Sequence, residues 1–264
     1  ELGTFVAVLI GQTLGSWYMA NEEFEIIVGL MAFSTFSGLI LSYRMEKTMP
    51  VGSKEKFHWN LFKDTWLSYR KITENKKIKN NIHAISWFWA MGIVYTTQLP
   101  VFTQIYMGGC AHVFSILLAV FSISIGLGSL TCAKISDGKI VKQFVIFGAI
   151  GIAFFSMILI GFNFHPHDHC LGLAEFSSSW HGVVNYVLIF MIGFSAGFYS
   201  VTCYNELQVI SPIEILSQVI GVNNVLNSCY MLFCSLICIL ILFFVSLWWL
   251  FVITIIANLF FALW

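Results

Sequence analysis

Apolar runs of about 20 residues recur along the chain, and they restrict its possible folds more than any other feature. Residues 144–162 and 183–201 are two examples. A bilayer core about 30 Å thick needs about 20 apolar residues in a helix that rises 1.5 Å per residue. Only 10% of the 264 residues are charged, against about a quarter in a soluble domain. The sequence therefore predicts an all-α, polytopic membrane protein.

Eight membrane helices can be assigned from these runs: 3–19, 24–43, 82–106, 112–134, 142–163, 182–204, 216–243 and 247–264. Lysine and arginine residues predict their orientation. Ten of the thirteen lie between residues 44 and 79, and the other three are Lys134, Lys139 and Lys142. Two helices separate these basic segments, so both lie on one side of the membrane, which the positive-inside rule identifies as the cytoplasm. Both ends of the chain are then expected on that side.

The polar segment 44–81 separates two helices from the six that follow. Five apolar residues recur in it at near-helical spacing among charged ones: Trp59, Leu61, Phe62, Trp66 and Leu67. This pattern is typical of an amphipathic helix that lies on the membrane surface. A binding site for a soluble partner is the alternative interpretation.

The seven cysteines lie mostly inside apolar runs, without the paired spacings of a zinc site or the density of a disulfide framework. We interpret them as small packing residues. The histidines of the segment 165–169 alternate with other residues in a loop. We interpret this segment as solvated, with pH sensing or adventitious metal binding as alternatives.

Ionisable residues are scarce at the depth of the bilayer, where they are costly and usually functional. Only Glu206, near the cytoplasmic end of the sixth helix, and Glu1 approach that position. Amide side chains are more frequent: Gln98, Gln104, Asn205, Gln208, Asn223, Asn224 and Asn227. An amide surrounded by lipid needs a hydrogen-bond partner, so these groups face other helices or a polar cavity. Both possibilities remain open at this point.

Small residues form two clusters that permit close approach of helices: Gly126, Gly128 and Ser129, then Gly193, Ser195, Ala196 and Gly197. The first cluster is followed by Lys134, Asp137, Gly138 and Lys139. It resembles the degenerate glycine-rich loop motif that major facilitators have between the second and third helix of each half. We predict that Gly128, Asp137, Gly138 and Lys139 form this conformational loop motif.

Longer segments carry a more specific resemblance: ELGTFVAVLIG (1–11), SWFW (86–89), QLP (98–100), LLAVFSISIGLGSL (117–130), GFYSV (197–201) and VIGVNNVLN (219–227). In order and spacing they resemble the bacterial lysophospholipid transporter family of the major facilitator superfamily. The same family occurs as a membrane module fused ahead of acyltransferase and acyl-carrier-protein synthetase domains. The resemblance implies about eight of twelve transmembrane helices, in a chain truncated at its N-terminus.

The domain organisation implied by the resemblance has three parts. Residues 1–43 are the last two helices of an N-terminal bundle, residues 44–81 are a basic cytoplasmic interdomain loop with an interfacial helix, and residues 82–264 are a C-terminal six-helix bundle. The sequence departs from the family at Thr202 and Cys203, where Pro-Leu is usual, and at Gln218, where the family has arginine. The second change removes a cation able to pair with a phosphate.

The resemblance also implies a function. The chain is expected to be a transporter and not an enzyme, which moves lysophosphatidylethanolamine across the bacterial inner membrane for re-acylation. Expected partners are membrane lipids, the lysophospholipid and a cytoplasmic acyltransferase, with no cofactor, no metal and no nucleic acid. Substrate-pathway candidates are Trp87, Trp89, Gln98, Asn205, Glu206, Asn223, Asn224 and Asn227. A drug or solute antiporter, a non-catalytic module of a bifunctional acyltransferase, or an inactive fragment are the alternatives.

Overall fold

The computed structural model describes residues 7, 10–11, 14–15, 24–45, 60–137, 139 and 141–263. The helices in these residues are α2 (Phe24–Tyr43), α3 (Leu61–Ile72), α4 (Lys76–Ile105), α5 (Ala111–Ser136), α6 (Gln143–Phe162), α7 (Leu173–Ser178), α8 (Trp180–Ile210), α9 (Leu216–Leu242) and α10 (Leu247–Leu263). Strands are absent from the described residues, where the single β-bridge joins Gly109 and Leu171. The predicted all-α class is confirmed.

Helices occupy seven of the eight predicted positions, and the predicted helix 3–19 lies largely outside the described residues. Five are long and apolar enough to cross a membrane: Glu25–Tyr43, Ala111–Ser136, Gln143–Phe162, Trp180–Ile210 and Leu216–Leu242. The apolar helix α10 is shorter, at 17 residues. The 30-residue α4 begins with a basic first turn, six residues before its predicted start. The chain is therefore a multi-pass membrane protein.

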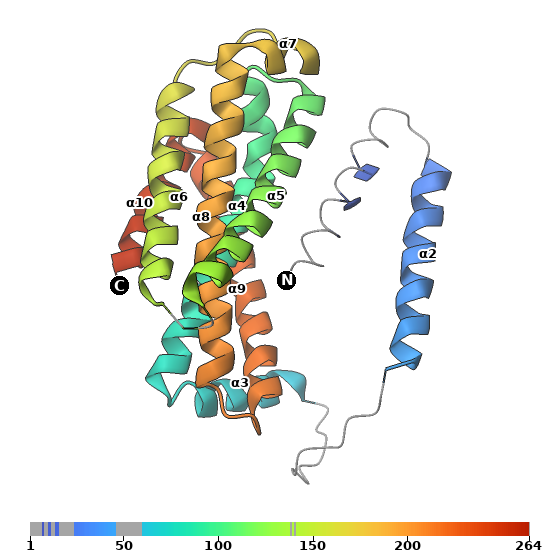
Figure 1. Cartoon of the computed structure of the whole chain (residues 1–264), viewed down its shortest axis with the longest axis vertical. Coiled ribbons are helices and arrows are strands. Elements are labelled where there is room, and N and C mark those ends of the chain that lie inside the picture. Colours follow the sequence, from blue (N-terminus) through green and yellow to red (C-terminus); the bar gives the residue numbers. More distant parts are fainter. Residues whose placement is uncertain are drawn as a thin grey trace.

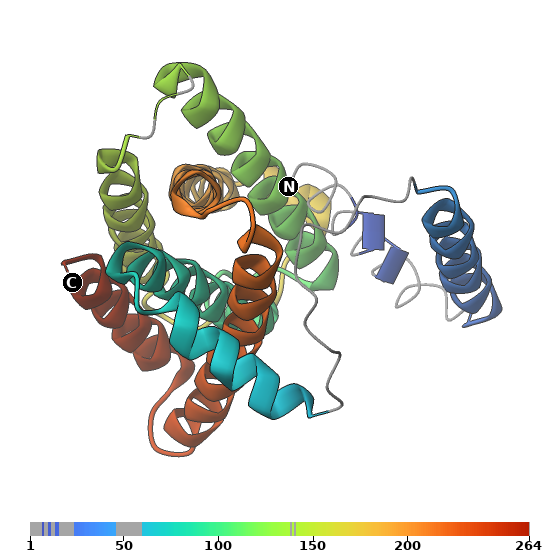
Figure 2. The ribbon, with the colours of Figure 1, turned by 90° about the horizontal axis from the view of Figure 1, so that it is seen from below.

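Six long helices, α4, α5, α6, α8, α9 and α10, form one bundle, and α2 stands apart from it (Figure 1). The bundle consists of two three-helix units, α4–α5–α6 and α8–α9–α10. The first helix of each unit packs against the second helix of the other, so that α4 contacts α9 and α5 contacts α8. The α4–α9 and α5–α8 pairs therefore occupy equivalent places in the order of the helices; Figure 2 shows the bundle from below.

Glycines mediate the α5–α8 pair. A Cβ atom at Gly128 would overlap the carbonyl oxygen of Phe194, and one at Gly197 would overlap that of Ile125. Because a backbone carbonyl cannot move aside as a flexible side chain can, the two helices approach this closely only with glycine at these positions. The close approach predicted from the two clusters of small residues is confirmed.

Polar side chains mediate the α4–α9 pair. The Ser86 hydroxyl donates a 2.9 Å hydrogen bond to Oδ1 of Asn227, and both side chains are buried. One turn before Ser86, Nδ1 of His83 lies 2.8 Å from the hydroxyl of Tyr230. These contacts satisfy polar groups that lipid would leave without partners.

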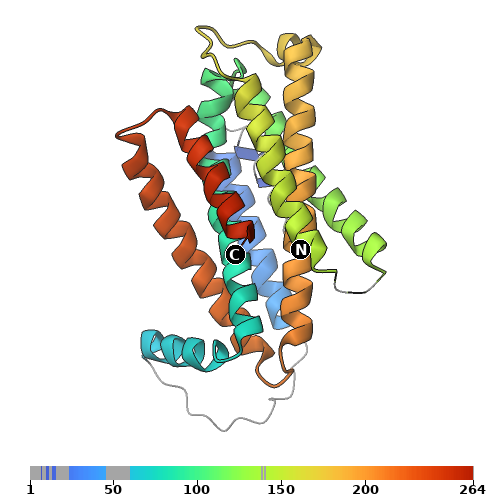
Figure 3. The ribbon, with the colours of Figure 1, turned by 90° about the vertical axis from the view of Figure 1, so that its left-hand side faces the viewer.

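The helix α3 lies across the end of the bundle that carries the basic segments (Figure 3). The side chain of Asn60 caps its start by accepting from the backbone N–H of Lys63 at 3.1 Å. Ile72 is buried in the bundle, whereas the side chain of Trp66 is 60% exposed. The predicted helix is therefore present, while its contact with a membrane stays a prediction. Trp59 lies outside the described residues.

The opposite end of the bundle carries a disulfide bond between Cys110 and Cys170, whose Cα atoms are 5.0 Å apart. Next to it, the N–H of Cys110 donates to the carbonyl of Leu171 at 3.0 Å, and the N–H of Leu171 donates to the carbonyl of Gly108 at 2.8 Å. The interpretation of all seven cysteines as packing residues was therefore wrong for these two. They lie in two loops, 60 positions apart in sequence, that the fold brings together.

The disulfide bond bears on the orientation of the chain. Disulfides persist in oxidising compartments and are rare in the cytoplasm. This one joins the α4–α5 turn to the segment between α6 and α7, at the end away from the basic segments. Its position agrees with the orientation predicted from the lysines and arginines. Cys132, Cys203 and Cys238 are buried inside the bundle, as expected of packing residues.

Candidate functional site

An apolar cavity of about 160 Å³ lies among α4, α5 and α8, with further contributions from α6 and α9. We call it the aromatic cavity, because Phe88, Trp89, Tyr95 and Phe121 form much of its wall. Apart from Tyr95 and the indole N–H of Trp89, the polar groups of the lining are the hydroxyls of Thr96 and Ser122. The lining contains no charged side chain in the described part of the chain.

The polar groups around the aromatic cavity are already paired. The hydroxyl of Tyr95 donates to Oγ of Ser156 at 2.7 Å. The hydroxyls of Thr96 and Ser122 donate to backbone carbonyls of their own helices, at 2.9 and 3.0 Å. The indole N–H of Trp89 donates to the hydroxyl of Tyr204 at 2.7 Å. The cavity therefore presents an apolar surface and suits an apolar part of a ligand.

A second cavity, of about 350 Å³, lies near the end of the bundle that carries the basic segments. Its walls come from the last turns of α5 and α8, from the connection that follows α5, and from Phe144 of α6. We call it the basic-end cavity. Lys139, Ser136, Asn205 and Gln208 contribute polar groups to its lining. Asn205 and Lys139 came from two separate sequence predictions, and the fold places them around one cavity.

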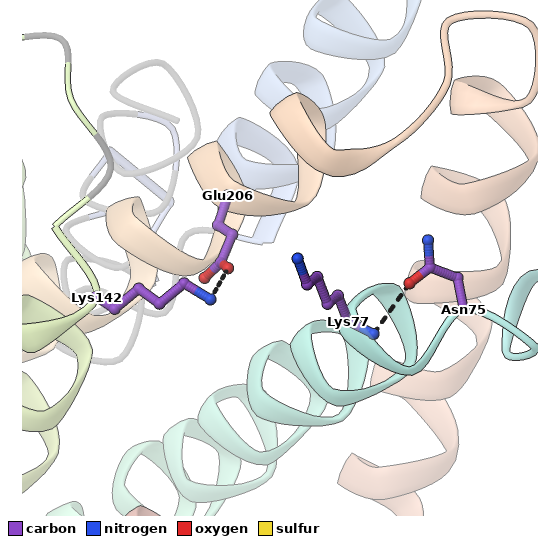
Figure 4. Close-up of polar contacts among 4 residues, drawn as sticks. All are labelled: Asn75, Lys77, Lys142 and Glu206. Carbon is purple, nitrogen blue, oxygen red and sulfur yellow. Dashed lines mark hydrogen bonds and ion pairs between the residues drawn. The ribbon is translucent and has the colours of Figure 1, made fainter.

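Glu206 forms an ion pair with Lys142, whose Nζ lies 2.8 Å from Oε1 of the carboxylate (Figure 4). The side chain of Glu206 is 12% exposed and that of Lys142 is 67% exposed. The pair joins the start of α6 to the final part of α8. The carboxylate nearest to bilayer depth in the sequence thus has a cation as its partner. Figure 4 also shows the side chain of Asn75 accepting a hydrogen bond at the start of α4.

The three asparagines of α9 differ in their surroundings. Asn227 is buried and bonded to Ser86, as predicted for an interhelical amide. Asn223 is also buried, and its Nδ2 lies 3.5 Å from Oδ1 of the exposed Asn224. Among the described residues, Oδ1 of Asn223 has no hydrogen-bond partner. Asn227 lies in the α4–α9 contact, and the aromatic cavity is lined by residues other than these three asparagines.

The structure separates the two tryptophans that the sequence grouped together. Trp89 lines the aromatic cavity, whereas the indole N–H of Trp87 donates to Asn258 of α10 at 3.2 Å. The ring of Trp87 also stacks on Phe261 at 4.7 Å. Residues two apart on a helix point in nearly opposite directions. Gln98 is half-buried, with its amide nitrogen 3.4 Å from the Thr97 hydroxyl.

The residues of the predicted loop motif have distinct positions. Gly128 lies in the α5–α8 contact, well before the loop. Asp137 ends α5 in the left-handed conformation, with φ of 48°, which aspartate adopts more readily than most residues. Lys139 lines the basic-end cavity, and Gly138 lies outside the described residues.

Sequence reasoning missed a buried amide pair between α6 and α8. Nδ2 of Asn163 donates to Oδ1 of Asn185 at 2.7 Å, and the reverse bond measures 3.3 Å. Both side chains are buried. An amide inside or beside an apolar run was the signal available for both, as it was for the asparagines of α9. The lining of the aromatic cavity gave no such signal, because phenylalanine and leucine also face lipid.

The comparisons with known proteins give one match. The model of the family described as Major Facilitator Superfamily matches residues 1–230. Comparison with curated proteins and with solved structures returns no match. The matched residues include every described helix from α2 to α8 and the first part of α9.

Proposed function

The chain belongs to the major facilitator superfamily of membrane transporters, and on this premise we propose that it carries lysophospholipid. The proposed substrate is lysophosphatidylethanolamine, moved from the outer to the inner leaflet of a bacterial inner membrane. A cytoplasmic acyltransferase then restores the second acyl chain. The proposal rests on the sequence resemblance together with the chemistry of the aromatic cavity.

The aromatic cavity is the observation that supports this proposal. A lysophospholipid combines one acyl chain with a polar headgroup, so its carrier needs an apolar surface inside the bundle. A carrier of sugars or ions needs polar groups that face the solute. The hydroxyls of Tyr95, Thr96 and Ser122 are bonded within the protein, which leaves aromatic and aliphatic surface for the acyl chain.

Gly92 offers a way to fill this cavity without disturbing the bundle. It lines the cavity, and a Cβ atom at this position would meet no other atom within 4 Å. The variant Gly92→Leu therefore places a side chain in the cavity while improving helix propensity by about 1 kcal/mol. Gly161 on α6 is the matched control, because its Cβ position is equally open and it lies outside the cavity lining.

The experiment measures uptake of labelled lysophosphatidylethanolamine by spheroplasts that lack their own lysophospholipid transporter. We expect uptake with the unmodified chain and with Gly161→Leu. Gly92→Leu should reduce uptake by about tenfold or more, which corresponds to about 1.4 kcal/mol of lost interaction. Equal uptake by both variants would exclude the aromatic cavity as the acyl-chain site. Absence of uptake in all three strains would contradict the proposed substrate.

A further inference from the structure

The basic-end cavity differs in chemistry from the aromatic cavity. Part of its wall is apolar, formed by Val141, Phe144 and Val201. The remainder carries a lysine and two amides, which the aromatic cavity lacks. A cavity with an apolar wall and a cation suits an amphiphile with an anionic group.

Asn205 and Gln208 are three residues apart on α8, so their side chains share one helix face. Both side chains are exposed, and both line the cavity. The hydroxyl of Ser136 is already bonded to the carbonyl of Ala133 at 3.0 Å, and that of Thr202 to the carbonyl of Phe198 at 2.8 Å. The hydroxyl of Tyr204, which also lines the cavity, is engaged by the indole N–H of Trp89. The two amides are exposed side chains of the lining that can donate hydrogen bonds to a ligand.

Lys139 is the cation of the cavity. Its side chain is exposed, and within the described residues no carboxylate pairs with it. The nearest acidic residue along α8, Glu206, is engaged by Lys142. The positive charge of Lys139 is therefore available to an anion from outside the chain.

We propose that the basic-end cavity binds the phosphate-bearing headgroup of a phospholipid from the cytoplasmic leaflet. Lys139 pairs with the phosphate, the amides of Asn205 and Gln208 donate hydrogen bonds to the headgroup, and Phe144 contacts the start of the acyl chains. The cavity lies at the last turns of α5 and α8, beside the basic connection 134–142, where the predicted orientation puts the headgroups of the cytoplasmic leaflet. This binding does not depend on which solute the protein transports.

The test uses the full chain in maltoside micelles, which contain no phosphate. Three ligands are titrated while the thermal unfolding midpoint is recorded: phosphatidylglycerol, diacylglycerol with the same acyl chains, and inorganic phosphate. The variant Lys139→Gln removes the cation. Lys134→Gln is the matched control, because Lys134 is also exposed near the end of α5 but lies outside the cavity lining.

We expect phosphatidylglycerol to raise the unfolding midpoint of the unmodified chain and of Lys134→Gln, whereas diacylglycerol has little effect. Lys139→Gln should raise the apparent Kd for phosphatidylglycerol by about tenfold or more, because the variant loses a charge-assisted contact with the phosphate. A rise with inorganic phosphate that depends on Lys139 would support the phosphate site and show that a free anion can occupy it. The proposal is overturned if diacylglycerol acts as strongly as phosphatidylglycerol, or if both lysine variants respond alike.

Discussion

The two equivalent helix pairs of the bundle are held together in different ways. In the α5–α8 pair, glycines bring backbone against backbone. In the α4–α9 pair, hydrogen bonds such as Ser86 to Asn227 join the helices, and Gly221 of α9 faces open space. A contact between backbones has one geometry, whereas hydrogen bonds between side chains tolerate some relative movement. The α5–α8 pair, which forms part of the wall of the aromatic cavity, therefore depends on glycine at fixed positions, whereas the α4–α9 pair depends on side-chain hydrogen bonds.

The largest expected effect comes from Gly197→Leu, which would break the α5–α8 pair. The added side chain meets the backbone of Ile125, so the helices must separate, at a cost of about 3 kcal/mol or more. Denaturation of the purified protein in detergent measures this loss of unfolding free energy. The control is Gly221→Leu on α9, where the Cβ position is open, and this variant should keep the stability of the unmodified chain or raise it by up to about 1 kcal/mol. Equal destabilisation by both would contradict the contrast between the pairs.

The disulfide bond is expected to have the next largest effect, since it ties the α4–α5 turn to the segment between α6 and α7, outside both helix pairs. Its closed loop of 60 positions predicts a loss of about 2 to 4 kcal/mol in Cys110→Ser. The same measurement of unfolding detects this loss. Alkylation of the unreduced protein should also leave Cys110 and Cys170 unmodified. If both thiols react freely without reductant, the two loops do not meet as described.

A smaller effect is expected from Asn227→Ala, which removes a hydrogen bond between α4 and α9. Loss of the bond to Ser86 should cost about 1 kcal/mol, which lies within the range of about 0.6 to 2 kcal/mol for hydrogen bonds between membrane helices. Ser86→Ala should add little when combined with it, because the bond is already absent. Strictly additive losses would show that the two side chains act independently.

The smallest effect is expected from the Lys142–Glu206 ion pair, which joins the start of α6 to the final part of α8. Helix α8 is also the partner of α5 in the glycine-mediated pair. Lys142 is largely exposed, so Lys142→Glu should lower the unfolding free energy by about 0.5 to 1 kcal/mol. The double variant with Glu206→Lys should recover most of that loss. If the double variant is no more stable than Lys142→Glu alone, the ion pair with Lys142 is not the contribution of Glu206 to stability.

The local features of the fold could be predicted from the sequence. The lengths of the apolar runs predicted the seven helix positions that the structure describes, and the small residues around Gly128 and Gly197 predicted close helix packing. Each of these signals is contained in a single segment of the sequence. Features that need distant segments could not be predicted. The disulfide requires two loops to meet, and the proximity of Lys139 to Asn205 requires the ends of α5 and α8 to converge. The aromatic cavity depends on three helices whose apolar faces resemble lipid-facing surface.

The proposed function requires the acyl chain of a lysophospholipid to occupy the aromatic cavity. Photocrosslinking tests it most directly, using lysophosphatidylethanolamine with a photoreactive group in its acyl chain and mapping the labelled peptides. We expect labelling of residues 88–96 of α4 and 118–125 of α5, and we expect excess unlabelled lysophosphatidylethanolamine to suppress it. Labelling confined to the exposed faces of α2 and α10, and insensitive to the competitor, would show that the acyl chain does not occupy the aromatic cavity.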